Sequence, residues 1–449
     1  MVKSPSSILF VGSGPLPSEK RDGVNAGGLR TAQFLDAIPQ EYNVSMFVVE
    51  NEEYTGVQKR NDFRHLRHVS VSRFDPSLFR HLRHFIRQTS PIDMVVGINF
   101  FPCFLASKEI PKDIPFWADM NGWALAEKQA QAAALQSNAY IPSAQKMERT
   151  ILARADKISV VSNPQKYAVF GEMAMLGLLT KDNFCHSIVE VVENSCRPLN
   201  HEEKTSPTRF RGNIFPQNAI VATWIGGMNA WADEKTLFEA CEIAMAKMAN
   251  FHFVMTGESL LGIDEESYPR FQKRVAESRF HERFHLLGWI PSEQVPSLLS
   301  EANMGINVDR FCIETETGAR NRINEMLRFG LPIVTTAGSE IAEYIEQYGA
   351  GKTCPSGSSE EIAQALITLG EGESLRQQCS KAGQTLIETR FSGSILQRSF
   401  CDWITNPVPS PKIMLHHENR ISAGISYLRH RGISAFGKRI LRELSARLP

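Results

Sequence analysis

Short apolar segments alternate along the chain with longer amphipathic segments. Each apolar segment is about three to seven residues long and ends at a glycine, a proline or a polar residue, which is typical of a strand buried on both faces. The amphipathic segments between them, such as 234–248, 295–302 and 320–329, have the apolar spacing of helices. The predicted strands are 8–12, 44–49, 94–98, 116–119, 157–162 and 188–192 in the first half, and 219–225, 252–256, 284–286, 304–308 and 332–335 in the second half.

This alternation predicts an α/β protein with parallel sheets that helices cover on both faces. A polar stretch at 201–218 contains two prolines and a glycine, and it is predicted to be a linker between two such units. We therefore expect two doubly wound, Rossmann-like domains that face a cleft, at residues 1–200 and 217–390. A helical tail is expected at 411–449.

Composition agrees with a folded protein of more than one domain. The 449 residues exceed what one hydrophobic core usually organises, and 42% hydrophobic with 22% charged residues excludes wholesale disorder. Lys and Arg total 49, as do Asp and Glu, so the overall charge gives no sign of a nucleic-acid partner. The eight cysteines are scattered without a Cys-x-x-Cys pair, which argues against a disulfide framework or a zinc site and favours a reducing cytosol.

No segment is predicted to cross a membrane. The apolar run at 6–12 is too brief for a signal peptide, and the longest apolar stretch, 94–106, is interrupted by Asn99 and Pro102. A helical span needs roughly 20 apolar residues. We expect a cytoplasmic protein that is at most peripheral, on the inner face of the cytoplasmic membrane.

Two segments depart from the even charge balance. Residues 59–87 and 412–447 each hold eight Lys or Arg against two acidic residues, interleaved with apolar positions. Such segments are typical of helices on an anionic membrane surface, so 59–87 and 411–449 are predicted membrane contacts; the alternative for the tail is packing on the first domain. Nucleic acid fits less well, because no stacking platform accompanies the charge. The hexapeptide Phe-Arg-His-Leu-Arg-His occurs at 63–68 and 79–84, which we interpret as chance or as two amphipathic helices.

The loops that follow strands in the second half contain glycines and aromatic residues. Ligands of doubly wound sheets bind beside such loops. After 219–225, two glycines let the backbone approach a ligand and the next helix start offers N–H groups to an anion, unless they only make a tight turn. After 284–286, the loop offers an apolar edge to a nucleobase, or is simply packed. The candidate ligand-binding residues of these loops are Gly226, Gly227, Asn229, Trp231, Gly257, Trp289 and Ile290.

The segment 314–335 contains the most informative charges. Arg320 and Arg322 stand in the first turn of a predicted helix, where cations oppose the helix dipole. A bound diphosphate would remove this conflict, because the helix N–H groups and a guanidinium would converge on it. The alternative is an arginine paired with Glu314 or Glu316. Glu325, near the helix end, is also placed against the dipole, and accepting hydrogen bonds from two ribose hydroxyls would explain it.

Residues 325–335, Glu-Met-Leu-Arg-Phe-Gly-Leu-Pro-Ile-Val-Thr, resemble the Glu-Ala-x-Ala-x-Gly-x-Pro-Val-Val segment of GT-B glycosyltransferases, especially the family 4 class that uses nucleotide sugars. The resemblance implies that Glu325 binds the donor ribose. It also implies an acid near Thr317, eight positions earlier, that contacts the transferred sugar; Glu316 is the candidate. The Arg and Lys that this family carries after the first strand of its second domain are not evident here, so Arg320 and Arg322 are expected to replace them.

The same resemblance assigns an acceptor side to the first half. Gly14, Gly27 and Gly28 resemble the glycine-rich first loop, which in these enzymes lies under the donor phosphates and shapes the acceptor site. After the strand at 116–119, Asp119 is expected to point into the cleft and accept the proton of an acceptor hydroxyl, and Asn121 to orient that hydroxyl. The alternative is an Asn-Gly turn capped by Asp119. The resemblance also implies that a helix at 391–410 crosses back to the first domain.

We therefore expect a glycosyltransferase that moves a sugar from a nucleoside diphosphate sugar to a hydroxyl, on a growing lipid-linked glycan of the bacterial cell surface. Helix N-termini and arginines would stabilise the leaving diphosphate, so no metal or cofactor is expected, in line with the lack of an Asp-x-Asp motif at a strand end. The resemblance implies retention of the anomeric configuration. Two alternatives stay open: a sugar-nucleotide 2-epimerase of the same fold, and a catalytically silent relative that scaffolds a biosynthetic complex.

Overall fold

The structure is a computed structural model that describes residues 6–19, 25–60, 67–199, 203, 209–260, 263–393, 397–409, 428–429 and 433. The chain divides into a large unit, Met1–Phe170 with Ser187–Ser410, and a small unit, Gly171–His186 with Pro411–Pro449. In the small unit, the side chains of Thr180 and Asn183 form a capping box around a short helix, η2 (Lys181–Asn183). Apart from residues 428–429 and 433, the basic tail predicted at 411–449 lies outside the described residues, so its membrane contact stays a prediction.

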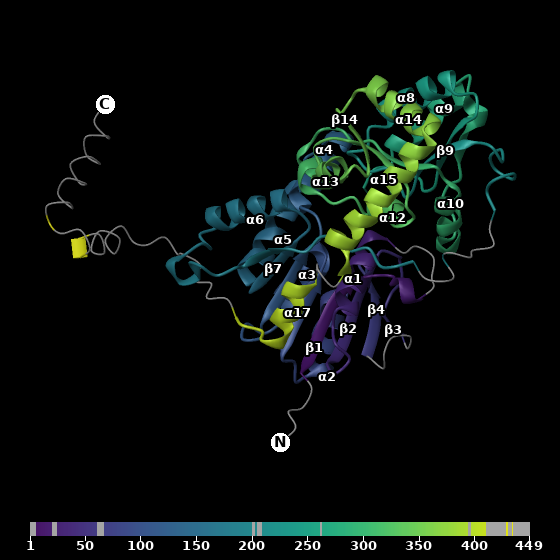
Figure 1. Cartoon of the computed structure of the whole chain (residues 1–449). Helices are drawn as coiled ribbons and strands as arrows, with labels where there is room; N and C mark the ends of the chain where they lie inside the picture. The colour runs from purple at the N-terminus through teal and green to yellow at the C-terminus, as the bar shows by residue number, and fades with distance from the viewer. Residues whose placement is uncertain are drawn as a thin grey trace. The chain divides into compact units, whose positions relative to one another are not determined.

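The first domain of the large unit contains an eight-stranded sheet in the order β3-β4-β2-β1-β5-β6-β7-β8 (Figure 1). All neighbouring strands are parallel except the edge pair β3 and β4. The strands are β1 (Ser7–Ser13), β2 (Asn43–Glu50), β3 (Val57–Arg60), β4 (Arg67–Ser72), β5 (Met94–Ile98), β6 (Phe116–Met120), β7 (Lys157–Val160) and β8 (Val189–Val191).

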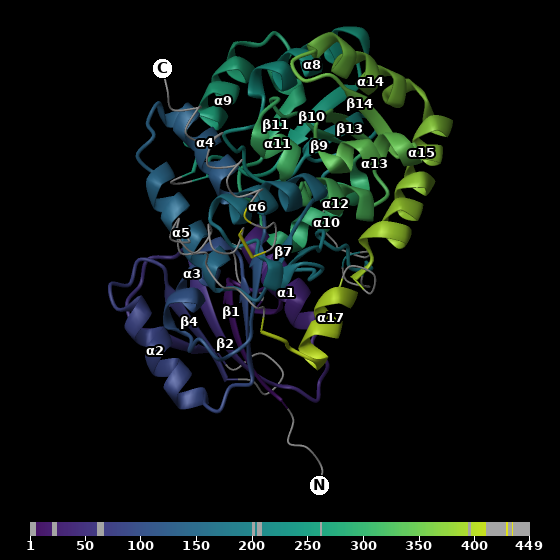
Figure 2. The same ribbon diagram turned by 90° about the vertical axis from the view of Figure 1, so that its left-hand side faces the viewer.

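Helices lie on both faces of this sheet (Figure 2). Side chains alternate between the two faces of a strand, so Ile8 and Phe10 face one helix layer while Leu9 and Val11 face the other. The first layer holds α1 (Ala26–Asp36) and α17 (Arg398–Thr405). The remaining helices of this domain are α2 (Leu78–Thr89), α3 (Phe100–Glu109), α4 (Ala124–Leu135), α5 (Ile141–Arg154), α6 (Asn163–Met175), which continues into the small unit, and the short η1 (Pro17–Glu19).

The second domain contains a six-stranded parallel sheet in the order β11-β10-β9-β12-β13-β14. Its strands are β9 (Ile220–Trp224), β10 (Phe251–Met255), β11 (Phe284–Leu286), β12 (Met304–Asn307), β13 (Ile333–Thr336) and β14 (Gly351–Cys354). One face packs on α8 (Glu234–Lys247), α9 (Ser267–Glu277) and α14 (Ser359–Glu371), and the other packs on α12 (Asn321–Arg328), α13 (Glu340–Tyr348) and α15 (Glu373–Leu386). Shorter helices are η3 (His281–Arg283), η4 (Ser292–Gln294), α10 (Val295–Glu301), α11 (Ile313–Thr317) and η5 (Ile387–Phe391).

These two sheets confirm the predicted fold class, and the predicted strands are all present with ends shifted by one or two residues. The sequence did not predict β3, β4 and β14, whose segments are short and rich in polar residues. The interpretation of the repeated hexapeptide as two helices is wrong. Its second copy lies in α2, but the end of its first copy, Arg67-His68, lies in β4; residues 63–66 are outside the described part.

The chain returns to the first domain after α15. There, the Phe400 ring of α17 packs edge-on against Phe34, with ring centroids 4.9 Å apart, and against Trp117, at 5.3 Å. Trp403 packs on the other side of Trp117 at 5.5 Å. Edge-to-face aromatic pairs add stabilisation beyond the apolar area that they bury. The last helix of the large unit is therefore part of the core of the first domain.

Two stretches of chain connect the domains, and they lie side by side. The outgoing stretch follows β8, and the returning stretch follows η5. The backbone N–H of Cys196 donates to the carbonyl oxygen of Phe391 at 2.8 Å, and Cys196 and Ser392 form a parallel bridge. The two crossings thus form a short paired ribbon.

The carboxyl-end loops of the two sheets meet across the domain boundary. The hydroxyl of Ser162, after β7, donates to the carbonyl oxygen of Thr317, after β12, at 2.6 Å. The side-chain amide of Asn324 donates to the carbonyl oxygen of Asn194 at 2.8 Å. Helix α4 of the first domain packs against α11 of the second. The predicted arrangement of two domains facing a cleft is therefore confirmed.

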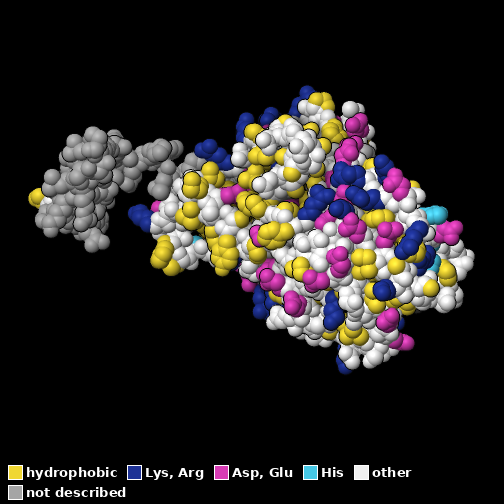
Figure 3. Space-filling model, turned by 90° about the horizontal axis from the view of Figure 1, so that it is seen from above, with side chains coloured by type: hydrophobic (Ala, Val, Ile, Leu, Met, Phe, Trp, Pro, Cys, Tyr) yellow, Lys and Arg dark blue, Asp and Glu magenta, His cyan; other side chains and the backbone are white. Residues whose placement is uncertain are grey.

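The surface shows no strong separation of charge on the face drawn in Figure 3, where Lys and Arg side chains lie among Asp and Glu side chains. Among the described residues, the buried Glu234 binds two cations, Arg270 and Arg310. Within the described part of the chain, none of the helices combines the length and the apolar character that crossing a bilayer requires.

The packing of α17 gives a test of the domain architecture. We expect Phe400→Ala to lower the free energy of unfolding by about 3–5 kcal/mol, because it removes a fully buried ring from between Phe34 and Trp117. Chemical denaturation followed by tryptophan fluorescence measures this. Val408→Ala is the control, since Val408 is exposed, and it should change stability little. Equal effects of the two substitutions would show that α17 does not contribute to the core.

Candidate functional site

The strand order identifies one ligand-binding edge in each sheet. In each domain the chain starts at a central strand, moves outward in one direction, and then returns to the other side of that strand. The reversal falls between β1 and β5 in the first sheet and between β9 and β12 in the second. Ligands of doubly wound sheets bind outside the carboxyl ends of strands at such a point. Many of the predicted site residues follow β1, β9 and β12, whereas Asn121, Gly257 and Trp289 follow β6, β10 and β11.

The predicted glycines of the first loop allow close packing. A Cβ atom on Gly28 would lie 2.1 Å from the carbonyl oxygen of Pro15, and a Cβ on Gly14 would lie 2.4 Å from Val48. Any larger residue would therefore displace the loop. Asn25 caps the start of α1 by accepting a hydrogen bond from the Gly28 N–H at 3.1 Å.

A hydrogen-bonded chain joins three loops at the carboxyl edge of the first sheet. Asn99, after β5, donates to the carbonyl oxygen of Gly27 at 3.0 Å and accepts from the Asn121 side chain at 2.9 Å. Asn99 holds a left-handed backbone with φ of 73°, which asparagine tolerates better than most residues. The predicted residues Gly27 and Asn121 thus lie together. Asn99 was missed, because from the sequence it only interrupts an apolar stretch.

Asp119 lies in the interior, so the expectation that it points into the cleft is wrong. Its side chain is fully buried and accepts two hydrogen bonds from Arg30, at 2.9 and 2.7 Å, and one from the Ser159 hydroxyl at 2.6 Å. Arg30 also donates to the carbonyl oxygens of Val192 and Glu193. A carboxylate with these partners is arranged to anchor α1 and β8 to the sheet.

Glu127 is a carboxylate at the domain boundary that the sequence analysis missed. It stands in the first turn of α4, and its Oε1 atom would be 2.6 Å from a Cβ atom added to Gly122. Burial raises the pKa of Glu127 to about 7, and the negative charge of Glu314 in the second domain adds to the rise. Lys128 and Arg320 act in the opposite direction. Its place just after a strand end was the available signal, but a single Glu in a helical pattern is not specific.

The predicted glycines of the second domain form stacked turns at the ends of β9, β10 and β11. Gly226 and Gly257 have positive φ values, 81° and 83°, and a Cβ atom on Gly257 would lie 2.4 Å from the Gly226 backbone. The Gly257 N–H donates to the carbonyl oxygen of Gly288 at 2.7 Å. A Cβ on Gly227 would lie 2.8 Å from a backbone oxygen, whereas one on Gly226 would meet nothing within 4 Å. Gly226 therefore leaves open space beside the turn.

The aromatic and polar candidate residues lie around these turns, and their side chains differ in how exposed they are. Trp289 is 59% exposed, and Ile290 packs partly against a small apolar cluster. Asn229 and Trp231 are half-buried; the Asn229 carbonyl accepts from the Ala232 N–H, and the Trp231 carbonyl accepts from Arg310. Trp289 is thus the candidate with the most free ring surface.

Arg320 is bound inside the second domain, which contradicts the expectation that it holds a diphosphate. It donates to Asp309 at 2.6 Å and to both oxygens of Glu314 at 3.0 and 2.8 Å. Its side chain and those of both carboxylates are about 95% buried. The pairing with Glu314 is one of the alternatives that the sequence left open. Gly318 is needed here, because a Cβ atom would lie 2.3 Å from the Glu314 carboxylate.

Arg322, two residues later, lies over the glycine turn. It donates to the carbonyl oxygen of Gly227 at 2.7 Å, and its guanidinium carbon lies 4.0 Å from the ring centroid of Trp224. Its Nη1 atom is buried and has no hydrogen-bond partner among the described residues. Burial lowers the pKa of Arg322 to about 10, and the neighbouring Arg320 contributes to the fall. An incoming anion would supply the missing partner.

The two predicted acids of this segment differ in their surroundings. Glu325 has a side chain 36% exposed and is paired with Arg328, which also binds the buried Glu203 at 3.0 and 2.7 Å. Glu316 is exposed on α11, a helix that packs against α4. The roles of Glu325 at a ribose and of Glu316 at a sugar stay predictions.

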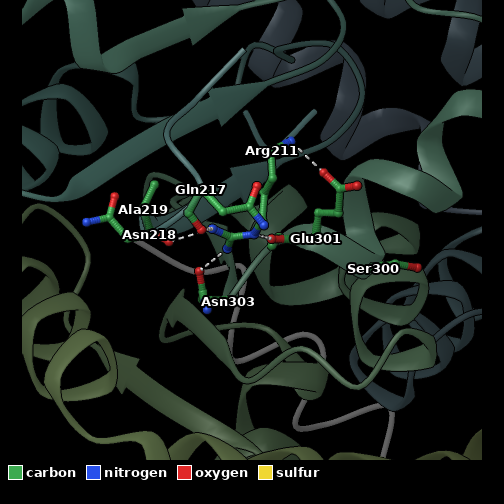
Figure 4. A pocket seen from close by; sticks show the side chains of 8 residues that line it. Arg211, Gln217, Asn218, Ala219, Ser300, Glu301 and Asn303 are labelled. Carbon is green, nitrogen blue, oxygen red and sulfur yellow. Dashed lines mark hydrogen bonds between the residues drawn. The ribbon is translucent and has the colours of Figure 1, made fainter. Parts of the chain in front are cut away.

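Two hollows lie near the second sheet. One, of about 530 Å³, is lined by Arg211, Gln217, Glu301 and Asn303 (Figure 4). It lies at the amino ends of β9 and β12, away from the candidate residues, and the Arg211 guanidinium inside it is already bonded to Glu301, Gln217, Ala219 and Asn303. A cavity of about 20 Å³ lies between the domains, lined by residues from both, including Asn194 and Arg320. We therefore assign the ligand site from the candidate residues and the strand order, and not from a hollow in the surface.

Comparison with known proteins agrees with this geometry. Residues 219–371 match the family described as Glycosyl transferases group 1. The amylovoran biosynthesis glycosyltransferase AmsK of Erwinia amylovora is 25% identical over 165 residues, which are 36% of this chain and only 39% of the length of AmsK.

Three solved structures are similar over nearly the whole of their own chains. HepE of Anabaena, in complex with UDP-glucose, has a TM-score of 0.64 and 12% identity and covers 89% of this chain and 99% of its own. Sucrose-phosphate synthase from Thermosynechococcus elongatus has a TM-score of 0.62 and 12% identity, with 89% and 98% covered. An α,α-trehalose-phosphate synthase (UDP-forming) from Burkholderia vietnamiensis has a TM-score of 0.65 and 11% identity, with 89% and 99% covered.

The resemblance seen at 325–335 is thus confirmed by an independent match to the segment that contains it. At 11–12% identity, the structural similarity shows the fold alone. Residues 219–371 match the glycosyl transferases group 1 family, and the chain as a whole has the GT-B fold.

Proposed function

We propose that this chain is a glycosyltransferase that transfers a sugar from a nucleoside diphosphate sugar to an acceptor hydroxyl. The observation that carries the proposal is Arg322, a guanidinium held over the Gly226–Gly227 turn with one buried nitrogen that has no hydrogen-bond partner among the described residues. The family match of the surrounding domain supports it. The diphosphate would lie against Gly226, where the backbone leaves open space, and accept hydrogen bonds from Arg322.

The rest of the donor would extend along the same edge. Glu325 would accept hydrogen bonds from the ribose, Trp289 and Ile290 would contact the base, and Glu316 would contact the sugar. HepE was crystallised with UDP-glucose, so a uridine diphosphate sugar is the first donor to test. No side chain of the described residues caps the start of α12. Its N–H groups and Arg322 would stabilise the charge of the leaving diphosphate, so we propose that no metal is required.

The acceptor would enter from the first domain. Its hydroxyl oxygen bonds to the anomeric carbon of the sugar, the bond from that carbon to the diphosphate oxygen breaks, and the hydroxyl proton must be accepted. We assign this role to Glu127 in place of Asp119, since Glu127 lies at the boundary near Glu314 and Arg320. Asn121, held by Asn99, would orient the hydroxyl. Retention of configuration is proposed from the family resemblance.

The biological setting is proposed by analogy with AmsK, which acts in amylovoran biosynthesis. A growing, lipid-linked glycan of the bacterial cell surface is the proposed acceptor. This setting would place the protein at the inner face of the cytoplasmic membrane.

A thermal-shift panel with UDP, GDP, ADP and dTDP tests the proposed function, because a ligand that binds only the folded state raises its apparent stability. We expect one nucleotide to raise the melting temperature. Binding of none would support the scaffold alternative. If the matching nucleotide sugar, incubated without acceptor, is inverted at C2, the epimerase alternative replaces the transferase.

The Arg322 site predicts a specific loss of affinity. We expect Arg322→Ala to weaken UDP binding about 10- to 100-fold, because charged hydrogen bonds contribute roughly 1.5–3 kcal/mol. Arg322→Lys should retain part of the affinity through its charge. Calorimetric titration measures this, with Lys235→Ala as the control, since Lys235 is exposed on α8 beyond the turn. Unchanged affinity in Arg322→Ala would remove Arg322 from the donor site.

Glu325→Ala should cause a loss of UDP affinity that can be distinguished from that of Arg322→Ala. We expect Glu325→Ala to weaken UDP binding by about 1–3 kcal/mol through lost hydrogen bonds to the ribose, and to weaken binding of inorganic pyrophosphate little, since that ligand has no ribose. Glu346→Ala, an exposed acid on α13, is the control. Loss of pyrophosphate binding as well would indicate that Glu325 acts by holding α12 in place and not through the ribose.

The raised pKa of Glu127 predicts that the rate of sugar transfer depends on pH. Its carboxylate can accept a proton only when ionised, so transfer rates should rise as the pH increases through about 7, and Glu127→Gln should lower the rate and flatten this rise. A raised pKa also means that the folded protein binds the proton more tightly, so this group stabilises the fold below its unfolded pKa and loses that contribution as the pH rises through 7. Thermal melts of both proteins across pH 4–8 measure the second effect.

The rate profile and the melting profile together distinguish a catalytic role of Glu127 from a structural role. If Glu127 is only structural, Glu127→Gln should change the melting profile and leave the shape of the rate profile as it was. Glu282→Gln, at an exposed acid, is the control and should change neither profile.

A further inference from the structure

Two cations stand at the carboxyl edge of the first sheet without a salt-bridge partner among the described residues. Arg73 directly follows β4, and Lys128 lies in the second turn of α4, after β6. Among the described residues, the Arg73 side chain donates one hydrogen bond, to Asn51 at 3.3 Å, and Lys128 donates one, to Gln131 at 2.8 Å. Both partners are neutral amides, so neither interaction removes the positive charge.

Arg73 and Lys128 interact electrostatically. The pKa of Lys128 is lowered, first by burial and also by the positive charge of Arg73, whereas Glu127 opposes the shift. Burial lowers the pKa of Arg73 as well. Asp75, the nearest acid in sequence to Arg73, is committed elsewhere, since it accepts hydrogen bonds from the Gly56 and Ser77 N–H groups at 2.6 Å and lies 3.4 Å from His81. The cation pair is therefore only partly neutralised.

Aromatic rings surround this pair. The Arg73 guanidinium lies 5.3 Å from the ring centroid of Phe101 and 5.5 Å from that of Phe74, and the Lys128 ammonium lies 5.9 Å from that of Tyr140. Phe74 is 57% exposed and Tyr140 is 49% exposed. Large exposed rings beside cations offer apolar surface to a ligand whose charged group the cations hold.

The position of the pair connects it with the proposed transfer. Lys128 is adjacent to Glu127, which lies near Glu314 and Arg320 in the second domain. The pair therefore flanks the point where an acceptor hydroxyl would meet the donor sugar, on the acceptor side.

We propose that Arg73 and Lys128 form a subsite for a phosphate group on the acceptor, with Phe74, Phe101 and Tyr140 as the apolar surface for the attached molecule. Arginine offers a fork of donors and lysine a point charge, and both bind phosphate oxygens. This inference rests on the glycosyltransferase function proposed above. The acceptor would thus be a sugar phosphate or a phosphate-linked glycan, rather than a neutral sugar.

The test compares glucose 1-phosphate, glucuronic acid and glucose as probes, titrated calorimetrically into the full chain saturated with UDP so that the donor site is occupied. We expect glucose 1-phosphate to bind at least tenfold more tightly than glucose and more tightly than glucuronic acid. Arg73→Gln and Lys128→Gln should each weaken glucose 1-phosphate binding about tenfold. The matched controls, Arg80→Gln on α2 and Lys146→Gln on α5, remove exposed cations and should not weaken it.

The outcomes separate this subsite from the donor site. Equal binding of glucose 1-phosphate and glucose, no binding of either, or unchanged affinity in both Arg73→Gln and Lys128→Gln would overturn the subsite while UDP binding still supports the proposed function. Equal binding of glucuronic acid would overturn the assignment to phosphate. If UDP fails to bind but glucose 1-phosphate binding depends on Arg73 and Lys128, the subsite stands and the donor assignment falls.

Discussion

The buried guanidinium of Arg320 determines the geometry of the second domain's ligand edge. Asp309 after β12 and Glu314 on α11 both accept hydrogen bonds from it, and all three side chains are almost fully buried. Removing one partner from such a cluster leaves a buried charge without compensation, which costs several kcal/mol. The loop between β12 and α12 is therefore held in one conformation. Because Arg320 is satisfied internally, Arg322 is the cation left to face the glycine turn.

The two domains contribute different chemistry to the same boundary. The second domain presents a cation over open backbone, suited to the anionic part of a donor. The first domain presents an amide chain through Asn99 and Asn121, a carboxylate in Glu127 with a pKa near neutrality, and beyond it the pair Arg73 and Lys128. Glu314 of the second domain raises the pKa of Glu127 and Lys128 of the first domain lowers it, so the ionisation of Glu127 depends on both domains.

The sequence predicted the fold better than the site, for a physical reason. Strands buried on both faces, such as β5 and β10, are runs of apolar residues that need no tertiary information. Strands β3 and β14 lie at sheet edges and carry polar residues, so their pairing depends on neighbours that the local sequence does not show. In the site, Arg320 and Arg322 are two positions apart on one helix start and so point in different directions. Which one meets Glu314 is decided by the loop between them and β12. The prediction for Asp119 was wrong for a similar reason, since its partner Arg30 is 89 residues away in sequence.

The paired crossings at Cys196 and Phe391 have a mechanical consequence. Two separate linkers would allow the two domains many different relative movements. Two segments that are hydrogen-bonded side by side bend together as one hinge. Since α17 anchors the returning segment in the first core, neither segment can slide against the other. Any opening of the two domains would therefore be mainly a rotation about this ribbon. Such a rotation would return the same residues of α4 and α11 to contact each time the domains close.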